Sequence, residues 1–94
     1  MSNSVVILPD VRGVVVTKLQ QLPGRAVFAV FDPLLMVHVH NFHDPVAGLK
    51  KMMDELKREV VRLGGNAVLG FTHEIVVHRG NIDYFGSGVV VTLD

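Results

Sequence analysis

Apolar and polar positions alternate with two different periods along the chain, and a single stretch has the period of a helix. From Pro45 to Leu63, apolar residues recur every three or four positions, as in a helix with one apolar face. The residues of that predicted face are Val46, Leu49, Met53, Leu56, Val60 and Leu63. Asp44 is a suitable N-cap, and Gly64 can take the left-handed conformation that ends a helix. The pattern therefore predicts an amphipathic helix over residues 45–63, which needs a sheet against its apolar face.

Runs with the period of a strand flank this helix on both sides. After it, residues 66–78 and 82–93 predict a hairpin whose turn is Arg79-Gly80-Asn81. Before it, residues 34–41 predict a strand that leads directly into the helix. Three short runs lie further upstream, SVVIL, GVVVTKL and AVFAVF, separated by turn-forming pairs such as Pro9-Asp10 and Asp32-Pro33. The predicted order is β-β-β-β-α-β-β, an α+β fold with one helix on a mostly antiparallel sheet. We expect residues 1–94 to form a single domain.

The apolar content is high for a chain of this length. Apolar residues make up 49% of the 94 residues, and the mean hydropathy is +0.40. One helix can cover only part of such a sheet, and the runs VVIL near the N-terminus and VVVTL at the C-terminus have no predicted cover. We therefore expect a homo-oligomer in which these strands are buried between subunits.

Charge and motif content narrow the functional classes. Nine basic and nine acidic residues balance at pH 7, so neither nucleic acid nor an anionic membrane is an expected partner. The chain has no cysteine, which excludes disulfides, thiolate nucleophiles and cysteine metal sites. It also has no apolar run long enough to span a membrane and no basic, signal-like N-terminus, so the expected location is the cytosol.

The sequence VHVHNFHD carries the strongest chemical signal, because three histidines fall within six residues. His38 and His40 alternate with valines, so both imidazoles should project from the same face of a strand while the valines face the helix. Two imidazoles can bind one divalent ion such as zinc, which needs three or four ligands. His43 lies just beyond the strand, and either His73 or Glu74 could complete the set from the strand after the helix, but not both, since they point to opposite faces. The alternative is that the imidazoles only fill a polar strand face.

A catalytic role has weaker support. His43, Asp44 and Asp83 are candidates for an acid–base pair at a subunit interface. No nucleophile motif, phosphate-binding loop or metalloprotease helix motif is present, and Gly86-Ser87-Gly88 lacks the frame of a serine nucleophile elbow. We therefore expect a binding and assembly module, with a small enzyme as the alternative.

The helix and the two strands after it resemble the YbjQ-like domain, a family described as heavy-metal-binding. The resemblance covers roughly the last half of the chain. In that family an amphipathic helix ends in a leucine–glycine step, an Asn/Asp-Ala-Val-x-Gly strand follows, and a last strand combines small residues with valines. The corresponding positions here are Leu63, Gly64, Asn66, Ala67, Val68 and Gly70, then Gly86, Ser87, Gly88, Val89 and Val90.

This resemblance implies a dodecin-like subunit with a β-α-β-β core that assembles into a ring, often a pentamer. It implies no defined biochemical role. The segment before the helix departs from the family pattern, because His43-Asp44-Pro45 and the preceding histidines stand where glycines and arginines are expected. Any family site in that segment therefore cannot be transferred to this chain, and the candidate metal ligands His38, His40, His43 and His73 rest on the residues alone.

Overall fold

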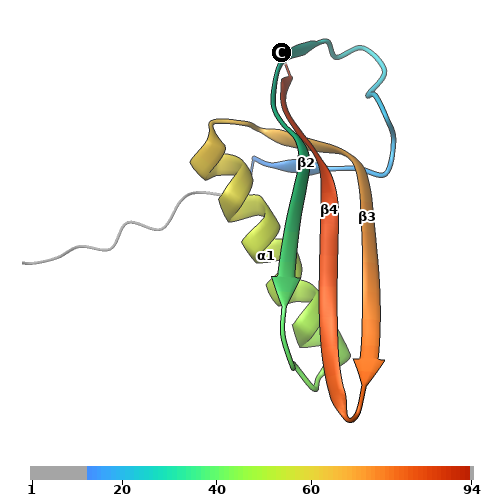
Figure 1. Cartoon of the computed structure of the whole chain (residues 1–94). Helices are drawn as coiled ribbons and strands as arrows, with labels where there is room; N and C mark the ends of the chain where they lie inside the picture. Colours follow the sequence, from blue (N-terminus) through green and yellow to red (C-terminus); the bar gives the residue numbers. More distant parts are fainter. Residues whose placement is uncertain (1–12, 94) are drawn as a thin grey trace, which may run out of the picture.

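The computed structural model describes residues 13–93. It contains one helix and four strands in the order β-β-α-β-β (Figure 1). The elements are β1 (Val15–Val16), β2 (Val27–Val39), α1 (Pro45–Leu63), β3 (Ala67–His78) and β4 (Asn81–Leu93). The predicted run SVVIL lies outside the described residues. No helix within residues 13–93 combines the length and the apolar content needed to cross a membrane.

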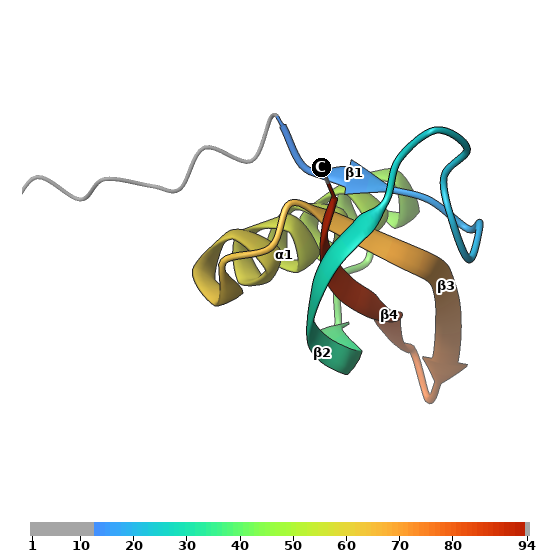
Figure 2. The same cartoon turned by 90° about the horizontal axis from the view of Figure 1, so that it is seen from above.

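The four strands form one sheet in the spatial order β1-β3-β4-β2. The short β1 runs parallel to β3, whereas β3 with β4 and β2 with β4 are antiparallel. Helix α1 packs on one face of this sheet, mainly against β2 and β4 (Figure 2). The predicted α+β class, with one helix on a mostly antiparallel sheet, is confirmed.

Two predicted strands before the helix are in fact one. The runs AVFAVF and LLMVHVHN join into β2, which continues through Pro33 instead of breaking there. β2 lies at an edge of the sheet, where the missing N–H of proline removes no hydrogen bond from a central ladder. The register against β4 shifts between Val30 and Asp32 and again between Asp32 and Leu35, which accommodates the irregular backbone. The other upstream run, GVVVTKL, contributes only the two residues of β1.

The predicted helix bounds are confirmed, and the caps explain them. The Asp44 carboxylate accepts hydrogen bonds from the backbone N–H groups of Val46 and Ala47, at 3.1 and 3.3 Å. Gly64 ends the helix with a φ of 92°. The predicted apolar face is only partly right, since Val46 is 79% exposed. The buried residues of α1 are Gly48, Met52, Leu56 and Val60.

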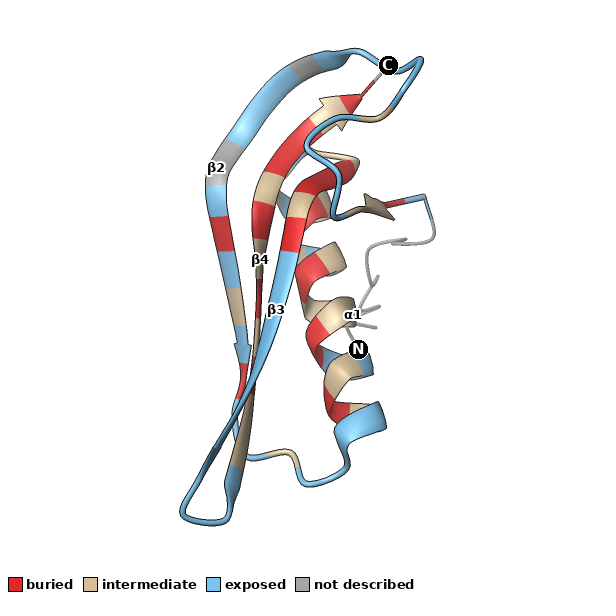
Figure 3. Ribbon diagram, turned by 90° about the vertical axis from the view of Figure 1, so that its right-hand side faces the viewer, coloured by how far each residue is buried: buried red, intermediate tan, exposed pale blue. Residues whose placement is uncertain are grey.

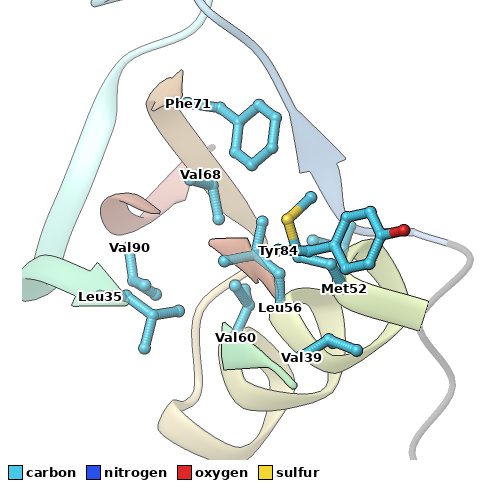
Figure 4. Packing of buried hydrophobic residues seen from close by; sticks show 10 residues of the cluster. Leu35, Val39, Met52, Leu56, Val60, Val68, Phe71, Tyr84 and Val90 are labelled. Atoms are coloured by element: carbon cyan, nitrogen blue, oxygen red, sulfur yellow. The ribbon is translucent and has the colours of Figure 1, made fainter. Parts of the chain in front are cut away.

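The main core lies between this helix stripe and the sheet (Figure 4). Tyr84 at its centre is fully buried and donates a hydrogen bond of 2.8 Å to the carbonyl oxygen of Phe42. A smaller apolar cluster of Ala67, Leu69, Val91 and Leu93 fills one end of the opposite face. The rest of that opposite face carries both polar and apolar side chains, and it is where the candidate site lies.

Among residues 13–93, β2 forms one long edge of the sheet, and β1 and β3 form the other (Figure 3). At the other edge, the chain from β1 onward bonds to β3 only as far as Phe71, where the Phe71 N–H donates to the carbonyl oxygen of Thr17. The segment 72–78 of β3 therefore has no strand beyond it among the described residues.

Candidate metal centre

His38, near the end of β2, and His40, directly after it, lie on the face of the sheet away from the helix. Between them, Val39 is only 4% exposed and packs in the main core, so strand alternation turns its two neighbours outward. In the ladder, Val39 pairs with the buried Tyr84, and His38 pairs with Phe85. The predicted orientation of the two histidines is confirmed.

Asp83 of β4 joins the two histidines on this outward face. Its Oδ1 lies 2.7 Å from His40 Nδ1 and 3.7 Å from His38 Nε2. One ligand atom from each of the three residues can be chosen so that all lie within 4.8 Å of one another. The histidine side chains are 46% and 65% exposed, whereas that of Asp83 is 22% exposed, so the group opens to water above a partly enclosed carboxylate.

Backbone and ring contacts hold this group in place. The Asn41 N–H donates a hydrogen bond of 3.0 Å to Asp83 Oδ1, and Asn41 takes a left-handed φ of 54° just after β2. On the other side, the His38 ring stacks on Phe85, with 4.5 Å between centroids and 4° between planes. The carboxylate and one of the two imidazoles are therefore oriented before any ligand binds.

The same contacts set the charge of the carboxylate. The hydrogen bond from the Asn41 N–H, followed by the bond to His40 and the charges of His40 and His38, lowers the pKa of Asp83 below its ordinary value. Asp83 is therefore ionised at neutral pH and presents an anionic oxygen between two imidazoles. This combination of donors suits a divalent ion such as Zn²⁺.

A lowered carboxylate pKa has a testable consequence for stability. Because the folded-state pKa of Asp83 lies below the ordinary value of 3.8, its stabilising effect is complete above that pH and is lost as the pH falls through the folded-state pKa. We expect Asp83→Asn to lower the unfolding midpoint at pH 7, with the gap to the native protein closing below about pH 4. Denaturant unfolding at a series of pH values measures this gap. A gap that stays constant down to pH 3 would contradict the charge effect.

The distances are compatible with a tetrahedral ion. Ligand bonds of about 2.0–2.1 Å to zinc place neighbouring ligand atoms about 3.3 Å apart. The separations of 2.7 and 3.7 Å from Asp83 Oδ1 lie on either side of this value, so modest rotations of exposed side chains would suffice. Three protein ligands leave a position open for water or another ligand.

The other two predicted ligands are not part of this group. His73 pairs with the buried Gly86 and therefore points to the helix side of the sheet, where its ring lies 5.9 Å from that of Phe71. His43 is exposed between β2 and α1 and contributes no atom to the group. The structure thus brings together His38 and His40 of the predicted set and adds Asp83, which the sequence had suggested only as an acid–base candidate.

The sequence alone predicts the face of the sheet on which Asp83 lies, but not which residues lie beside it. Alternation from an inward Tyr84 places Asp83 outward, but its position beside the two histidines depends on how β2 and β4 align. That alignment is set by a long connection through the helix, not by a tight hairpin turn. Local pattern therefore could not identify the third ligand.

Comparisons with known proteins support the fold. No protein-family model matches the sequence, and no curated protein matches it. Among solved structures, the chain is similar to the crystal structure of a protein of unknown function from Pediococcus pentosaceus, described as belonging to the DUF74 family. The two sequences are 16% identical; the superposition has a TM-score of 0.57 and covers 88% of this chain and 100% of the other. DUF74 is another name for the YbjQ-like family, so the resemblance is confirmed at the level of the fold, and it assigns no function.

Proposed function

We propose that the protein is a non-enzymatic, homo-oligomeric module that binds a divalent metal ion, with Zn²⁺ as the best match to its ligands. The observation that carries this proposal is the convergence of His38, His40 and Asp83 within 4.8 Å on one open face of the sheet. Two imidazole nitrogens and an ionised carboxylate oxygen favour zinc over the harder ions magnesium and calcium, which prefer oxygen ligands alone.

Exposed apolar residues along the sheet edges support the oligomeric part of the proposal. On β2, Met36 is 62% exposed; on β3, Val77 is 69% exposed. Unpaired strand edges with apolar side chains are surfaces on which a second chain can add to the sheet. A second copy of this chain is the simplest partner with matching features.

One contact favours the alternative, acid–base catalysis. His40 Nδ1 lies 2.7 Å from Asp83 Oδ1, within the range of a histidine–carboxylate pair. The predicted pair of His43 with Asp44 has less support, because the Asp44 carboxylate caps α1. Metal binding uses His40 and Asp83 together with His38. Acid–base catalysis by the His40–Asp83 pair gives no role to His38.

Zinc titration of the native protein tests the proposal. We expect one zinc ion per chain by native mass spectrometry, removed by a chelator, and a rise in melting temperature with zinc concentration, since binding to the folded state adds about 2.7 kcal/mol at a concentration 100 times Kd. Calcium at the same concentrations should give no rise. The variant His78→Ala removes an exposed histidine outside the group and should behave like the native protein. A protein that stays metal-free at 100-fold excess zinc, or that loses binding in His78→Ala, would contradict the proposed site.

A further inference from the structure

The candidate site lies on an edge strand, so a neighbouring chain that extended the sheet would lie directly beside it. We infer that the Glu74 carboxylate of a second copy supplies a further ligand to the His38–His40–Asp83 group, through pairing of the β3 edge of one copy with the β2 edge of the next. This inference rests on the proposed function and assigns a fourth ligand, which residues 13–93 of a single chain do not provide.

The direction and the side chains of the two edges suit each other. β2 and the segment 72–78 of β3 lie at opposite edges of one sheet. They run in the same direction, because both are antiparallel to β4. Each edge carries an exposed apolar side chain on the outward face, Met36 on β2 and Val76 on β3. Pairing one edge with the other joins different surfaces of the two copies, a head-to-tail contact that closes into a ring when the rotation fits.

The register within one chain identifies Glu74. His38 and Glu74 both pair with Phe85, one from each side, so the three residues form a single row across the sheet. Strand alternation places all three on the outward face, since Tyr84, next to Phe85, is buried on the helix side. Neighbouring strands are about 4.8 Å apart, which puts Glu74 about 10 Å from His38 of its own chain, with Phe85 between them. Glu74 therefore does not belong to the group of its own chain.

When the β3 edge of one copy pairs with the β2 edge of the next, Glu74 and His38 of different copies lie closer together than they do within one chain. We infer the register in which each row of one copy continues into the same row of the next. Glu74 of one copy then lies on the strand next to His38 of the other, about 4.8 Å away by backbone spacing. The other outward positions of the free β3 edge, Thr72, Val76 and His78, fall in other rows. Glu74 is the residue that this geometry places at the open ligand position.

The charge of the Glu74 carboxylate also supports its assignment as a metal ligand. Within residues 13–93, the exposed Glu74 carboxylate has no hydrogen bond or ion pair of its own. A carboxylate facing a metal held by two neutral imidazoles and one carboxylate would bring the site to charge balance with a divalent ion. It would also give zinc a complete tetrahedral set, as in closed structural sites. Metal binding and assembly would then stabilise each other.

The variant Glu74→Gln separates this inference from the proposed function. We expect Glu74→Gln to keep one zinc per chain but to raise the zinc Kd at least about tenfold in calorimetric titration, since losing even a supporting partner of a ligand commonly costs 10- to 100-fold. We also expect it to weaken the zinc-promoted association seen by native mass spectrometry. His78→Gln, on the same strand face, is the matched control and should leave both properties unchanged. If native protein binds no zinc, the proposed function fails; if it binds zinc and Glu74→Gln binds it equally well, only this inference fails.

Mixed assemblies test whether Glu74 acts between copies. One variant lacks the histidines, His38→Ala with His40→Ala, but keeps Glu74; the other, Glu74→Gln, keeps the histidines. Neither alone should bind zinc with native affinity. When the two are co-expressed with different tags and purified as a mixed assembly, contacts between unlike copies restore complete sites, and we expect native-affinity binding at a fraction of the sites. Mixed assemblies without any native-affinity sites, or native protein that remains monomeric with zinc bound, would overturn the inference.

Discussion

Replacing both His38 and His40 with alanine should abolish the zinc-dependent rise in melting temperature and reduce zinc affinity by at least about 100-fold. Two of the three protein ligands of the proposed site are lost, and a single carboxylate such as Asp83 binds divalent ions only weakly in water. In free energy this is about 2.7 kcal/mol or more of binding. Isothermal titration at pH 7 measures the affinity, and thermal unfolding at fixed protein concentration measures the stabilisation.

The fold should survive this double substitution. The two histidine side chains are 46% and 65% exposed, and the buried residues beside them, Val39 and Tyr84, stay unchanged. Without zinc, we therefore expect the melting temperature of the double variant to stay within a few degrees of the native value, as for most surface changes of about 0.5 kcal/mol or less. The matched control is His43→Ala, which removes a neighbouring exposed histidine outside the group. A double variant that keeps the full zinc response would show that the metal binds elsewhere.

The parts of the fold that depend on local chemistry were predictable from the sequence. The bounds of α1 follow from Asp44 and Pro45 at one end and Gly64 at the other, and each acts within one helical turn. The hairpin of β3 and β4 follows from its turn, where Arg79 and Gly80 both have positive φ, at 50° and 81°. The shared face of His38 and His40 follows from alternation alone.

The remaining features depend on contacts between distant segments. β2 continues through Pro33 because it is an edge strand, and no local pattern shows which strand lies at an edge. Asp83 completes the histidine group only through the register of β2 against β4. The buried stripe of α1 runs through Gly48 and Met52, and Val46 is left exposed, because the helix is positioned by the side chain of Tyr84. Because glycine has no apolar side chain, the hydrophobic pattern could not show that Gly48 lies where the helix contacts the sheet.

Gly48 gives the second large prediction, since it lets α1 approach the sheet closely. A Cβ atom at this position would collide with Cε2 and Cζ of the Tyr84 ring and would lie 2.8 Å from its hydroxyl oxygen. The ring cannot easily move aside, because it is fully buried and its hydroxyl donates to the Phe42 carbonyl oxygen. We therefore expect Gly48→Ala to lower the free energy of unfolding by about 2–3 kcal/mol, the upper range for overpacking a core. For a chain of this size, that corresponds to a fall in melting temperature of roughly 10–20 °C.

Whether Gly48→Ala raises or lowers the free energy of unfolding tests the packing of α1 against Tyr84. In an exposed helix, glycine to alanine normally stabilises by about 1 kcal/mol, because alanine restricts the unfolded chain and favours the helix. At Gly48 the collision with Tyr84 has to exceed that gain. Gly13→Ala is the matched control, since a Cβ there meets nothing within 4 Å, and it should change the free energy of unfolding by less than about 0.5 kcal/mol. A Gly48→Ala variant more stable than the native protein would mean that α1 lies further from β4 than the Tyr84 contact requires. Because Tyr84 precedes Phe85 and follows Asp83, such a shift would also alter the strand that supports the metal group.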